Sequence, residues 1–243
     1  MTSPLTIAVA QPALVPEDVT ANAETHAASI QAAGADVVVF PELSLTGYEL
    51  SAPPVSADDP ALNPVVEACA ATGAVALAGG PVRDADGREF IATFAIDGQG
   101  ATVAYRKMWL HEPEPERFVP GEKPAVIDVR GWRLGLAICM DTGVPDHARL
   151  TADAGMDAYV ASTLFSPAGA VQRDHRMAGI AADHGVWVAA ASFAGPSSHY
   201  PETSGGSGIW SPDGSLVVQA GPGTGAVVTA RLVSRAASGV PRF

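Results

Sequence analysis

The stretch Asp36-Val-Val-Val-Phe-Pro-Glu42 decides the fold class of this chain. Three valines and a phenylalanine form a continuous apolar run, which is typical of a strand that is buried on both faces. Pro41 ends the run because proline cannot donate to a strand ladder, and the carboxyl group of Glu42 follows at once. A strand of this kind predicts an α/β protein in which helices cover the faces of a sheet.

Similar apolar runs alternate with helical segments along the rest of the chain. There is no internal repeat, long linker or break in composition, so we predict a single domain over residues 1–243, with a core at about 5–232 and a tail at 233–243. We expect hairpins at 89–106 and 207–219, where Gly-containing turns join two strand-like runs. The other strands are expected at 6–10, 74–78, 125–129, 132–138, 158–162, 186–191 and 226–232, and the helices at 17–33, 61–72, 145–154 and 170–184.

Charge and composition exclude several classes of protein. The formal net charge of −12 argues against a surface that neutralises the phosphates of a nucleic acid, so we predict no nucleic-acid partner. Two cysteines, Cys69 and Cys139, are too few for a disulfide framework or a Cys-rich zinc site. Residues 1–10 are typical of a strand rather than a signal peptide, and no apolar run approaches the roughly 20 residues of a membrane span. We therefore expect a reduced, cytoplasmic protein without a membrane partner.

Three apolar strands lead to a side chain that can take part in catalysis. Glu42, Lys107 and Cys139 each follow such a run, and ligands of open α/β sheets gather at the carboxyl ends of strands. A thiol is a weak nucleophile until it loses its proton. A carboxylate can take that proton, and an ammonium can hold the negative charge that develops on a substrate oxygen. The three groups together predict acyl transfer, provided that they converge.

Each of these residues also has an ordinary structural interpretation. A Cys in an apolar strand is usually a small core residue, and a Glu after Phe-Pro is usually solvated. A Lys on a hairpin is usually exposed, but this chain has two lysines against twelve arginines, so Lys107 indicates a need for a compact ammonium. We expect no catalytic role for the other cysteine and the other lysine: Cys69, in a predicted helix, should pack in the core, and Lys123, between Glu and Pro, should lie on the surface. The six histidines show no metal-ligand spacing, so we expect no metal.

Five segments in chain order resemble the motifs of the carbon–nitrogen hydrolase (nitrilase) superfamily. Phe40-Pro-Glu-Leu43, Tyr105-Arg-Lys107 and Ala137-Ile-Cys-Met-Asp141 are similar to its three catalytic motifs. Phe118-Val-Pro-Gly121 is similar to the Phe-x-Pro-Gly stretch that follows the lysine. Ser207-Gly-Ile-Trp-Ser-Pro-Asp-Gly214 is similar to the late strand and turn of the family.

The resemblance implies a four-layer α-β-β-α sandwich that forms a homodimer or a higher homo-oligomer. It implies hydrolysis of a non-peptide C–N bond in a small amide, carbamoyl compound or nitrile, without a metal or an organic cofactor. Carried onto this chain, it makes Glu42 the general base, Lys107 the oxyanion stabiliser and Cys139 the nucleophile that accepts the acyl group. The backbone N–H of Met140 is implied as a second oxyanion donor.

The resemblance also implies a second glutamate after the lysine, four residues before the Phe of Phe-x-Pro-Gly. This position is Glu114, with Glu112 and Glu116 beside it as alternatives. The sequence departs from the family pattern at Met140, where an aromatic residue is usual, and at Trp109, where a histidine is often found. These departures concern the shape of the pocket, so they leave the substrate open.

Candidate pocket residues lie near the predicted nucleophile. The resemblance places the segment 162–167, which follows a strand, close to it. We expect Tyr48, Trp109, Leu164, Phe165 and Ser166 to line the pocket, with plain packing as an equal explanation for each.

The favoured function is an amidase that acts on a small linear amide or carbamoyl compound. Three alternatives stay open. The first is a nitrilase that uses the same residues, and the second is a catalytically silent binding protein with the same fold. The third is a Cys–His hydrolase that uses His147 or His175 as its base.

Overall fold

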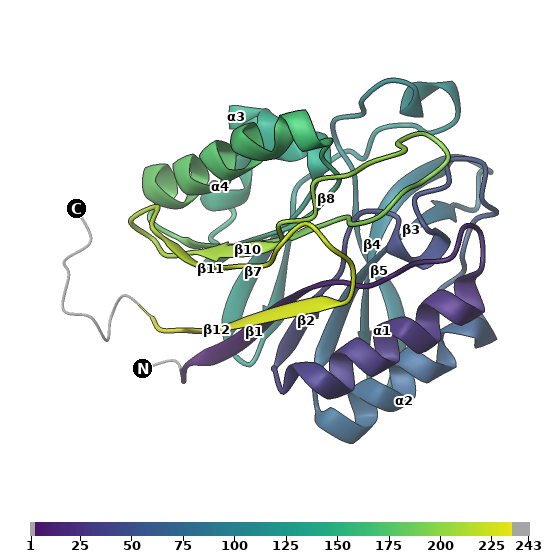
Figure 1. Cartoon of the computed structure of the whole chain (residues 1–243), viewed down its shortest axis with the longest axis horizontal. Helices are drawn as coiled ribbons and strands as arrows, with labels where there is room; N and C mark the ends of the chain where they lie inside the picture. The colour runs from purple at the N-terminus through teal and green to yellow at the C-terminus, as the bar shows by residue number, and fades with distance from the viewer. Residues whose placement is uncertain (1–2, 235–243) are drawn as a thin grey trace.

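Two six-stranded sheets pack face to face in the computed structural model, which describes residues 3–234 (Figure 1). The strand orders are β12-β1-β2-β3-β4-β5 and β11-β10-β9-β8-β7-β6. Two helices cover the outer face of each sheet, which confirms the predicted four-layer α-β-β-α sandwich. The helices are α1 (Val19–Ala33), α2 (Asn63–Thr72), α3 (Pro145–Asp153) and α4 (Ala170–His184). The strands are β1 (Leu5–Gln11), β2 (Val37–Val39), β3 (Val75–Arg83), β4 (Glu89–Asp97), β5 (Gly100–Arg106), β6 (Ala125–Val129), β7 (Trp132–Ile138), β8 (Ala158–Thr163), β9 (Trp187–Ser192), β10 (Gly208–Trp210), β11 (Leu216–Gln219) and β12 (Ala226–Leu232).

Three apolar clusters fill the three interfaces between the four layers. Alternate residues of β2 and β7, such as Val37, Val39 and Leu134, lie between the two sheets. Val38 instead packs in the cluster under α1 and α2, and Ala137 in the cluster under α3 and α4. Because successive residues of a strand point to opposite faces, β2 is buried throughout, as its composition predicts.

The expected elements are present with shifts at some of their ends. The helix predicted from residue 17 begins at Val19, because the side chain of Asp18 accepts a hydrogen bond from the backbone nitrogen of Ala21 at 3.0 Å and caps the first turn. The strand predicted at 74–78 is wrong in length, since β3 continues to Arg83. Its second half pairs with β4 but lies beyond the end of β2, so Pro81 is tolerated there.

The first and last strands of the described chain lie side by side in the first sheet. β1 and β12 pair antiparallel at the edge of the first sheet, with Leu5 opposite Leu232. The predicted tail, 233–243, lies outside the described residues from position 235 onward. Among residues 3–234, no helix is long and apolar enough to cross a membrane.

Candidate active site

The ammonium of Lys107 is buried between two carboxylates where ends of both sheets meet. Its Nζ donates to Oε1 of Glu42 at 2.7 Å and to the two oxygens of Glu114 at 2.6 and 2.8 Å. Lys107 and Glu42 are fully buried, and Glu114 is nearly so. A buried charge is strongly destabilising when it loses its partner, so these three residues form one electrostatic unit.

This unit keeps Lys107 protonated. Burial alone would lower the pKa of the ammonium, but the charges of Glu42, Cys139 and Glu114 raise that pKa above its usual value. An ammonium that holds its proton donates hydrogen bonds and does not accept protons. Lys107 can therefore stabilise a negative charge, but it cannot act as a base at neutral pH.

Glu42 is the group in this unit that titrates near neutral pH. Burial raises the pKa of its carboxyl to about 7; Lys107 opposes that rise and Glu114 adds to it. One oxygen, Oε1, is held by Lys107, whereas Oε2 has no hydrogen-bond partner of normal geometry among the described residues. Buried polar atoms without a partner are rare in folded proteins, and this one leaves Glu42 an oxygen with which to exchange a proton.

Cys139 follows β7 in a strained backbone conformation beside Glu42. Its φ is +42°, in the left-handed region that side-chain-bearing residues rarely adopt. The thiol donates to the backbone oxygen of Leu164 at 3.3 Å, and it lies near enough to Glu42 to lower the pKa of that carboxyl. Burial raises the pKa of the thiol, and the Glu42 carboxylate raises it further, while Lys107 lowers it. The resting thiol therefore keeps its proton until a base takes it.

A short 3₁₀ turn, η4 (Cys139–Gly143), begins at this cysteine. The first N–H groups of a helical turn have no partner within the turn. The structure places Met140, the expected second oxyanion donor, in this first turn. Its backbone N–H can therefore donate to an oxygen held beside the sulfur of Cys139.

Of the three glutamates at 112–116, Glu114 is the one that reaches Lys107. It begins the 3₁₀ turn η3 (Glu114–Glu116) and also accepts a hydrogen bond from the backbone nitrogen of His111 at 2.9 Å. Glu112 and Glu116 are exposed. The position implied by the Phe-x-Pro-Gly spacing is thus the one that the fold buries.

The Phe-x-Pro-Gly stretch binds the backbone of Lys107. The backbone nitrogen of Gly121 donates to the backbone oxygen of Lys107 at 2.7 Å. A Cβ at Gly121 would collide with the backbone oxygen of Arg106, so the close approach of the two segments requires glycine. At the other end of the stretch, the backbone nitrogen of Phe118 donates to the backbone oxygen of Glu114 at 2.9 Å. The motif therefore holds the backbones of both Lys107 and Glu114 in place.

Replacing Gly79 by alanine is expected to misplace Glu42 and to lower kcat by about 10- to 100-fold. A Cβ at Gly79 on β3 would lie 2.5 Å from the backbone nitrogen of Leu43 and 3.2 Å from the carbonyl carbon of Glu42. Gly179→Ala in α4 is the matched control, because its Cβ would meet nothing within 4 Å. Steady-state kinetics of the two variants check this expectation, and an unchanged kcat for Gly79→Ala would contradict it.

Asp141 joins the nucleophile strand to the segment after Lys107, a role that the sequence did not reveal. Its Oδ2 accepts from the backbone nitrogen of Ile138 at 2.8 Å and from the Tyr105 hydroxyl at 2.7 Å. Its Oδ1 accepts from the backbone nitrogen of Trp109 at 2.9 Å. A buried carboxylate with several donors is firmly held, so Asp141 sets the distance between the two loops that carry the site.

The two candidate histidines of the Cys–His alternative lie in other surroundings. His147 is buried between two hydroxyls, with Nδ1 2.7 Å from that of Tyr159 and Nε2 3.0 Å from that of Tyr105. His175 is exposed on α4. Because the thiol faces Glu42 and Leu164 instead, this geometry gives the Cys–His alternative no support. Within residues 3–234, no group of three or more His, Cys, Asp or Glu is arranged to hold a metal ion.

Two of the five candidate pocket residues, Tyr48 and Leu164, belong to the apolar cluster against which the nucleophile packs. Leu164 accepts the thiol hydrogen bond through its backbone. Tyr48 is buried, and burial raises the pKa of its hydroxyl, with a further contribution from the carboxylate of Glu42.

The other three candidates lie less directly at the site. The ring of Trp109 packs edge-on against His147, with centroids 5.5 Å apart. Phe165 lies under the guanidinium of Arg176, 5.8 Å from its carbon, and Ser166 is exposed. A part for these residues in substrate binding stays a prediction.

Two further aromatic residues beside the site were not expected. Phe193 follows β9, and Tyr200 lies in the segment between β9 and β10. Both rings pack edge-on against Tyr48, with centroids 5.9 and 5.8 Å away. Their local sequence is that of a strand end and a Pro- and Ser-containing loop, so only tertiary structure reveals them.

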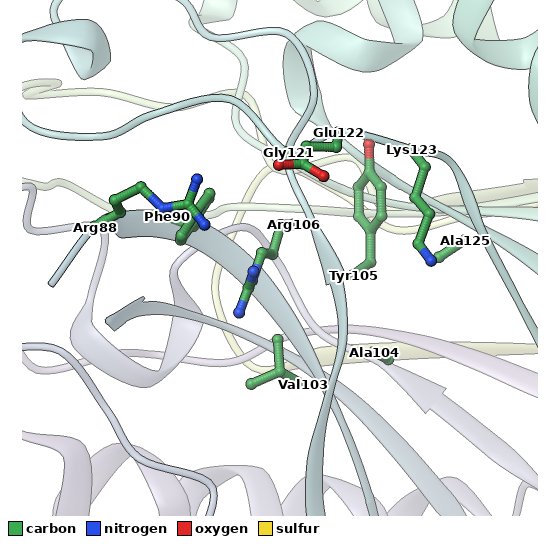
Figure 2. A pocket seen from close by; sticks show the side chains of 10 residues that line it. All are labelled: Arg88, Phe90, Val103, Ala104, Tyr105, Arg106, Gly121, Glu122, Lys123 and Ala125. Atoms are coloured by element: carbon green, nitrogen blue, oxygen red, sulfur yellow. The ribbon is translucent and has the colours of Figure 1, made fainter. Parts of the chain in front are cut away.

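A separate cavity of about 310 Å³ lies along β5, at the edge of the first sheet (Figure 2). The guanidinium carbons of Arg106 and Arg88 lie 4.4 and 5.6 Å from the ring centroid of Phe90. Lys123 and Glu122, both exposed, also line this cavity. None of the catalytic candidates lines it, so it is distinct from the site around the thiol.

The chain matches a known family of enzymes over most of its length. The profile of the family described as "Carbon-nitrogen hydrolase" matches residues 6–241. A Pseudomonas protegens protein named "Hydrolase in pqqF 5'region" is 31% identical over 215 residues, which span 85% of this chain and 75% of that protein. An (R)-stereoselective amidase from a Pseudomonas species is 29% identical over 148 residues, which span 59% of this chain and 54% of the amidase.

A solved structure shares the fold. An amidase from Nesterenkonia AN1, of the nitrilase superfamily, superposes with a TM-score of 0.84 at 24% identity, over 96% of this chain and 92% of that one. At this identity the likeness to the solved structure shows a shared fold only. Membership of the family is shown instead by the sequence, through the family profile and the Pseudomonas protegens relative. This chain therefore belongs to the carbon–nitrogen hydrolase family, and it is a hydrolase that acts on carbon–nitrogen bonds other than peptide bonds.

Proposed function

We propose that this hydrolase cleaves a small linear amide or carbamoyl compound through a thioester on Cys139 and releases ammonia or an amine. The observation that carries the proposal is the buried unit of Glu42, Lys107 and Glu114 against the thiol. It supplies a base with a pKa near neutral, a fixed positive charge and a nucleophile at one point. The amidase among the relatives supports an amide rather than a nitrile.

In the first half of the reaction, Glu42 takes the proton of the thiol while the sulfur attacks the carbonyl carbon. Since the pKa of the thiol is raised, proton transfer accompanies attack rather than preceding it. The carbonyl oxygen becomes an oxyanion, which Lys107 and the N–H of Met140 stabilise. The C–N bond then breaks, and the nitrogen leaves with the proton that Glu42 had accepted.

In the second half, water hydrolyses the thioester. Glu42, ionised again, takes a proton from the water as its oxygen attacks the acyl carbon. Glu114, which shares Lys107 with Glu42, helps to position this water. The carbon–sulfur bond breaks, Cys139 recovers its proton from Glu42, and the carboxylic acid departs.

The substrate range is tested with matched pairs of small amides and nitriles that share one acyl group. We expect ammonia release from the amide to be faster than from the nitrile for every pair. Faster release from the nitriles would favour the nitrilase alternative. Release from neither class, together with reversible binding of the amides, would favour a silent binding protein.

The activity is expected to fall as the pH is lowered through about 7, because Glu42 must be ionised to accept the thiol proton. The charge of Glu114 contributes to the raised pKa of Glu42, so Glu114→Gln should move the acid limb of kcat/KM to lower pH. The neighbouring Glu112→Gln, at an exposed position, should leave the limb near 7. A limb that stays in place in Glu114→Gln would contradict this coupling between the two carboxyls.

Two further features of the proposed enzyme rest on the sequence, the oligomer on the family resemblance and the cellular setting on the use of cysteine. We infer a homodimer or higher homo-oligomer, which sedimentation velocity measures directly. We also infer a reducing, cytoplasmic setting, since Cys139 must remain a free thiol to react, and both cysteines are free in the structure.

A further inference from the structure

We infer that Tyr200, together with Tyr48 and Phe193, selects the acyl group of the substrate and favours an uncharged, apolar one. The inference rests on the proposed function, whose site these residues flank. They come from three separate segments of the chain, and here they are called the aromatic wall. Tyr48 and Phe193 are buried, while Tyr200 is half-buried at the rim.

The three rings of the aromatic wall are joined through contacts of Tyr48. The Tyr48 ring lies edge-on to both others, at centroid distances of 5.9 Å to Phe193 and 5.8 Å to Tyr200. Edge-to-face contacts at these distances are favourable and hold aromatic rings in a fixed relation. The backbone of Tyr48 has a φ of +60°, so its position is imposed by the surrounding structure rather than by local preference.

The aromatic wall lies beside the reacting atoms. The apolar cluster between the sheets contains Tyr48, Phe193 and Leu164, with Cys139 and Tyr200 packed against it. Burial raises the pKa of the Tyr200 hydroxyl, and Cys139, once deprotonated, adds more to that rise than any other charged group. The three rings and the thiol thus belong to one apolar cluster, and we place the acyl group of the substrate against these rings.

The charges of the Glu42–Lys107–Glu114 unit disfavour an anionic acyl group. Glu42 and Glu114 supply two negative charges when ionised and Lys107 one positive charge, so the unit is negative overall. Both carboxylates already bind Lys107. A substrate carboxylate next to this unit would thus meet net negative charge, and the ammonium within the unit is already paired with two carboxylates. A substrate ammonium would have to lose its water against apolar rings.

A buried glutamate holds the segment that carries Tyr200 against the segment that carries Tyr48. Glu49 follows Tyr48 directly, and its Oε1 accepts from the backbone nitrogen of Ser198 at 3.0 Å, while the Ser198 hydroxyl donates to Oε2. The backbone nitrogen of Ser197 also donates to the backbone oxygen of Tyr200 at 2.8 Å. Glu49 is therefore a positioning residue for the aromatic wall.

The first test compares two neutral amides that differ in their acyl group, acetamide and phenylacetamide. We expect Tyr200→Ala to lower the preference for phenylacetamide, as a ratio of kcat/KM values, by about 3- to 10-fold. Tyr200→Phe should keep the preference, because it keeps the ring. Glu202→Gln, an exposed position in the same segment, is the control. Equal losses for both amides in Tyr200→Ala would overturn the inference, since they would indicate a merely structural role.

The second test does not need turnover. Iodoacetamide and iodoacetate both form a carbon–sulfur bond with a thiol and release iodide, but the first is neutral and the second anionic. Relative to their rates with a free thiol in solution, we expect iodoacetamide to label Cys139 at least about 10-fold faster than iodoacetate. Faster labelling by iodoacetate, or turnover that prefers an amide with a carboxylate or ammonium on its acyl group, would overturn the inference. If the protein shows the labelling preference but hydrolyses no amide, the proposed function is wrong, whereas the selectivity of the aromatic wall for neutral groups still holds.

Discussion

Replacing Cys139 by alanine is expected to abolish turnover, with a loss of at least about 10⁴-fold, while the fold survives. Removal of a catalytic nucleophile has effects of this size or larger. The thiol is a small group that makes one backbone hydrogen bond, to Leu164, so its loss should change the free energy of unfolding little. Ammonia release and denaturant unfolding, measured on the same preparation, check both halves of this expectation.

The chain supplies its own control in the second cysteine. Cys69 is a buried residue of α2, its sulfur donates to the backbone oxygen of Ile96 at 3.4 Å, and burial raises the pKa of its thiol to about 11. Cys69→Ala should therefore lower stability by about 1 kcal/mol and leave kcat unchanged. Wild-type ammonia release by Cys139→Ala would be incompatible with the thioester mechanism.

Replacing Lys107 by methionine is expected to lower both kcat and the free energy of unfolding. The variant loses the oxyanion partner, which typically lowers kcat by about 10²–10³-fold. It also leaves the carboxyls of Glu42 and Glu114 buried without a counter-charge, and breaking a buried ion pair in this way lowers the free energy of unfolding by about 3–5 kcal/mol. Lys123→Met, at the other lysine, which is exposed, should change neither quantity.

The destabilisation by Lys107→Met should depend on pH in a defined direction. Without the ammonium, the pKa of Glu42 rises further above its value in the unfolded chain, so the folded variant binds more protons. Its stability is then greatest at low pH and falls as the pH rises through the folded pKa. Urea unfolding at pH 5.5 and pH 8 measures this slope. A variant with wild-type stability at pH 8 would show that Glu42 and Glu114 do not depend on the lysine.

Local sequence signals predicted most of the fold. β6 and β12 have their predicted bounds, as do β7 and α4, because their apolar runs end at clear turn signals. β3 was predicted too short because Gly79, Gly80 and Pro81 read as a turn. In the structure these residues continue the strand, where Gly79 gives room to the loop that carries Glu42. The sequence around Gly79 alone does not reveal that the backbone of another segment must pass close to it.

The candidate site shows the same division between local and non-local information. Glu42 and Cys139 follow buried apolar strands, as the sequence predicts. Lys107 instead follows β5, a partly exposed strand at the edge of its sheet, and the fold brings the three residues together. Tyr200 and Asp141 act through partners that are far away in the sequence, such as Tyr48 and Tyr105. Predicting them requires the packing of the two sheets, which no single stretch of sequence contains.

The thioester mechanism places the acyl group of the substrate on Cys139. Acid quenching during turnover, followed by digestion and mass spectrometry, detects this intermediate. The peptide containing Cys139 should gain the mass of the acyl group, less one hydrogen, and hydroxylamine should remove it. An acyl mass on any other residue, or an unmodified Cys139 peptide at every time point while ammonia is released, would contradict a thioester on Cys139.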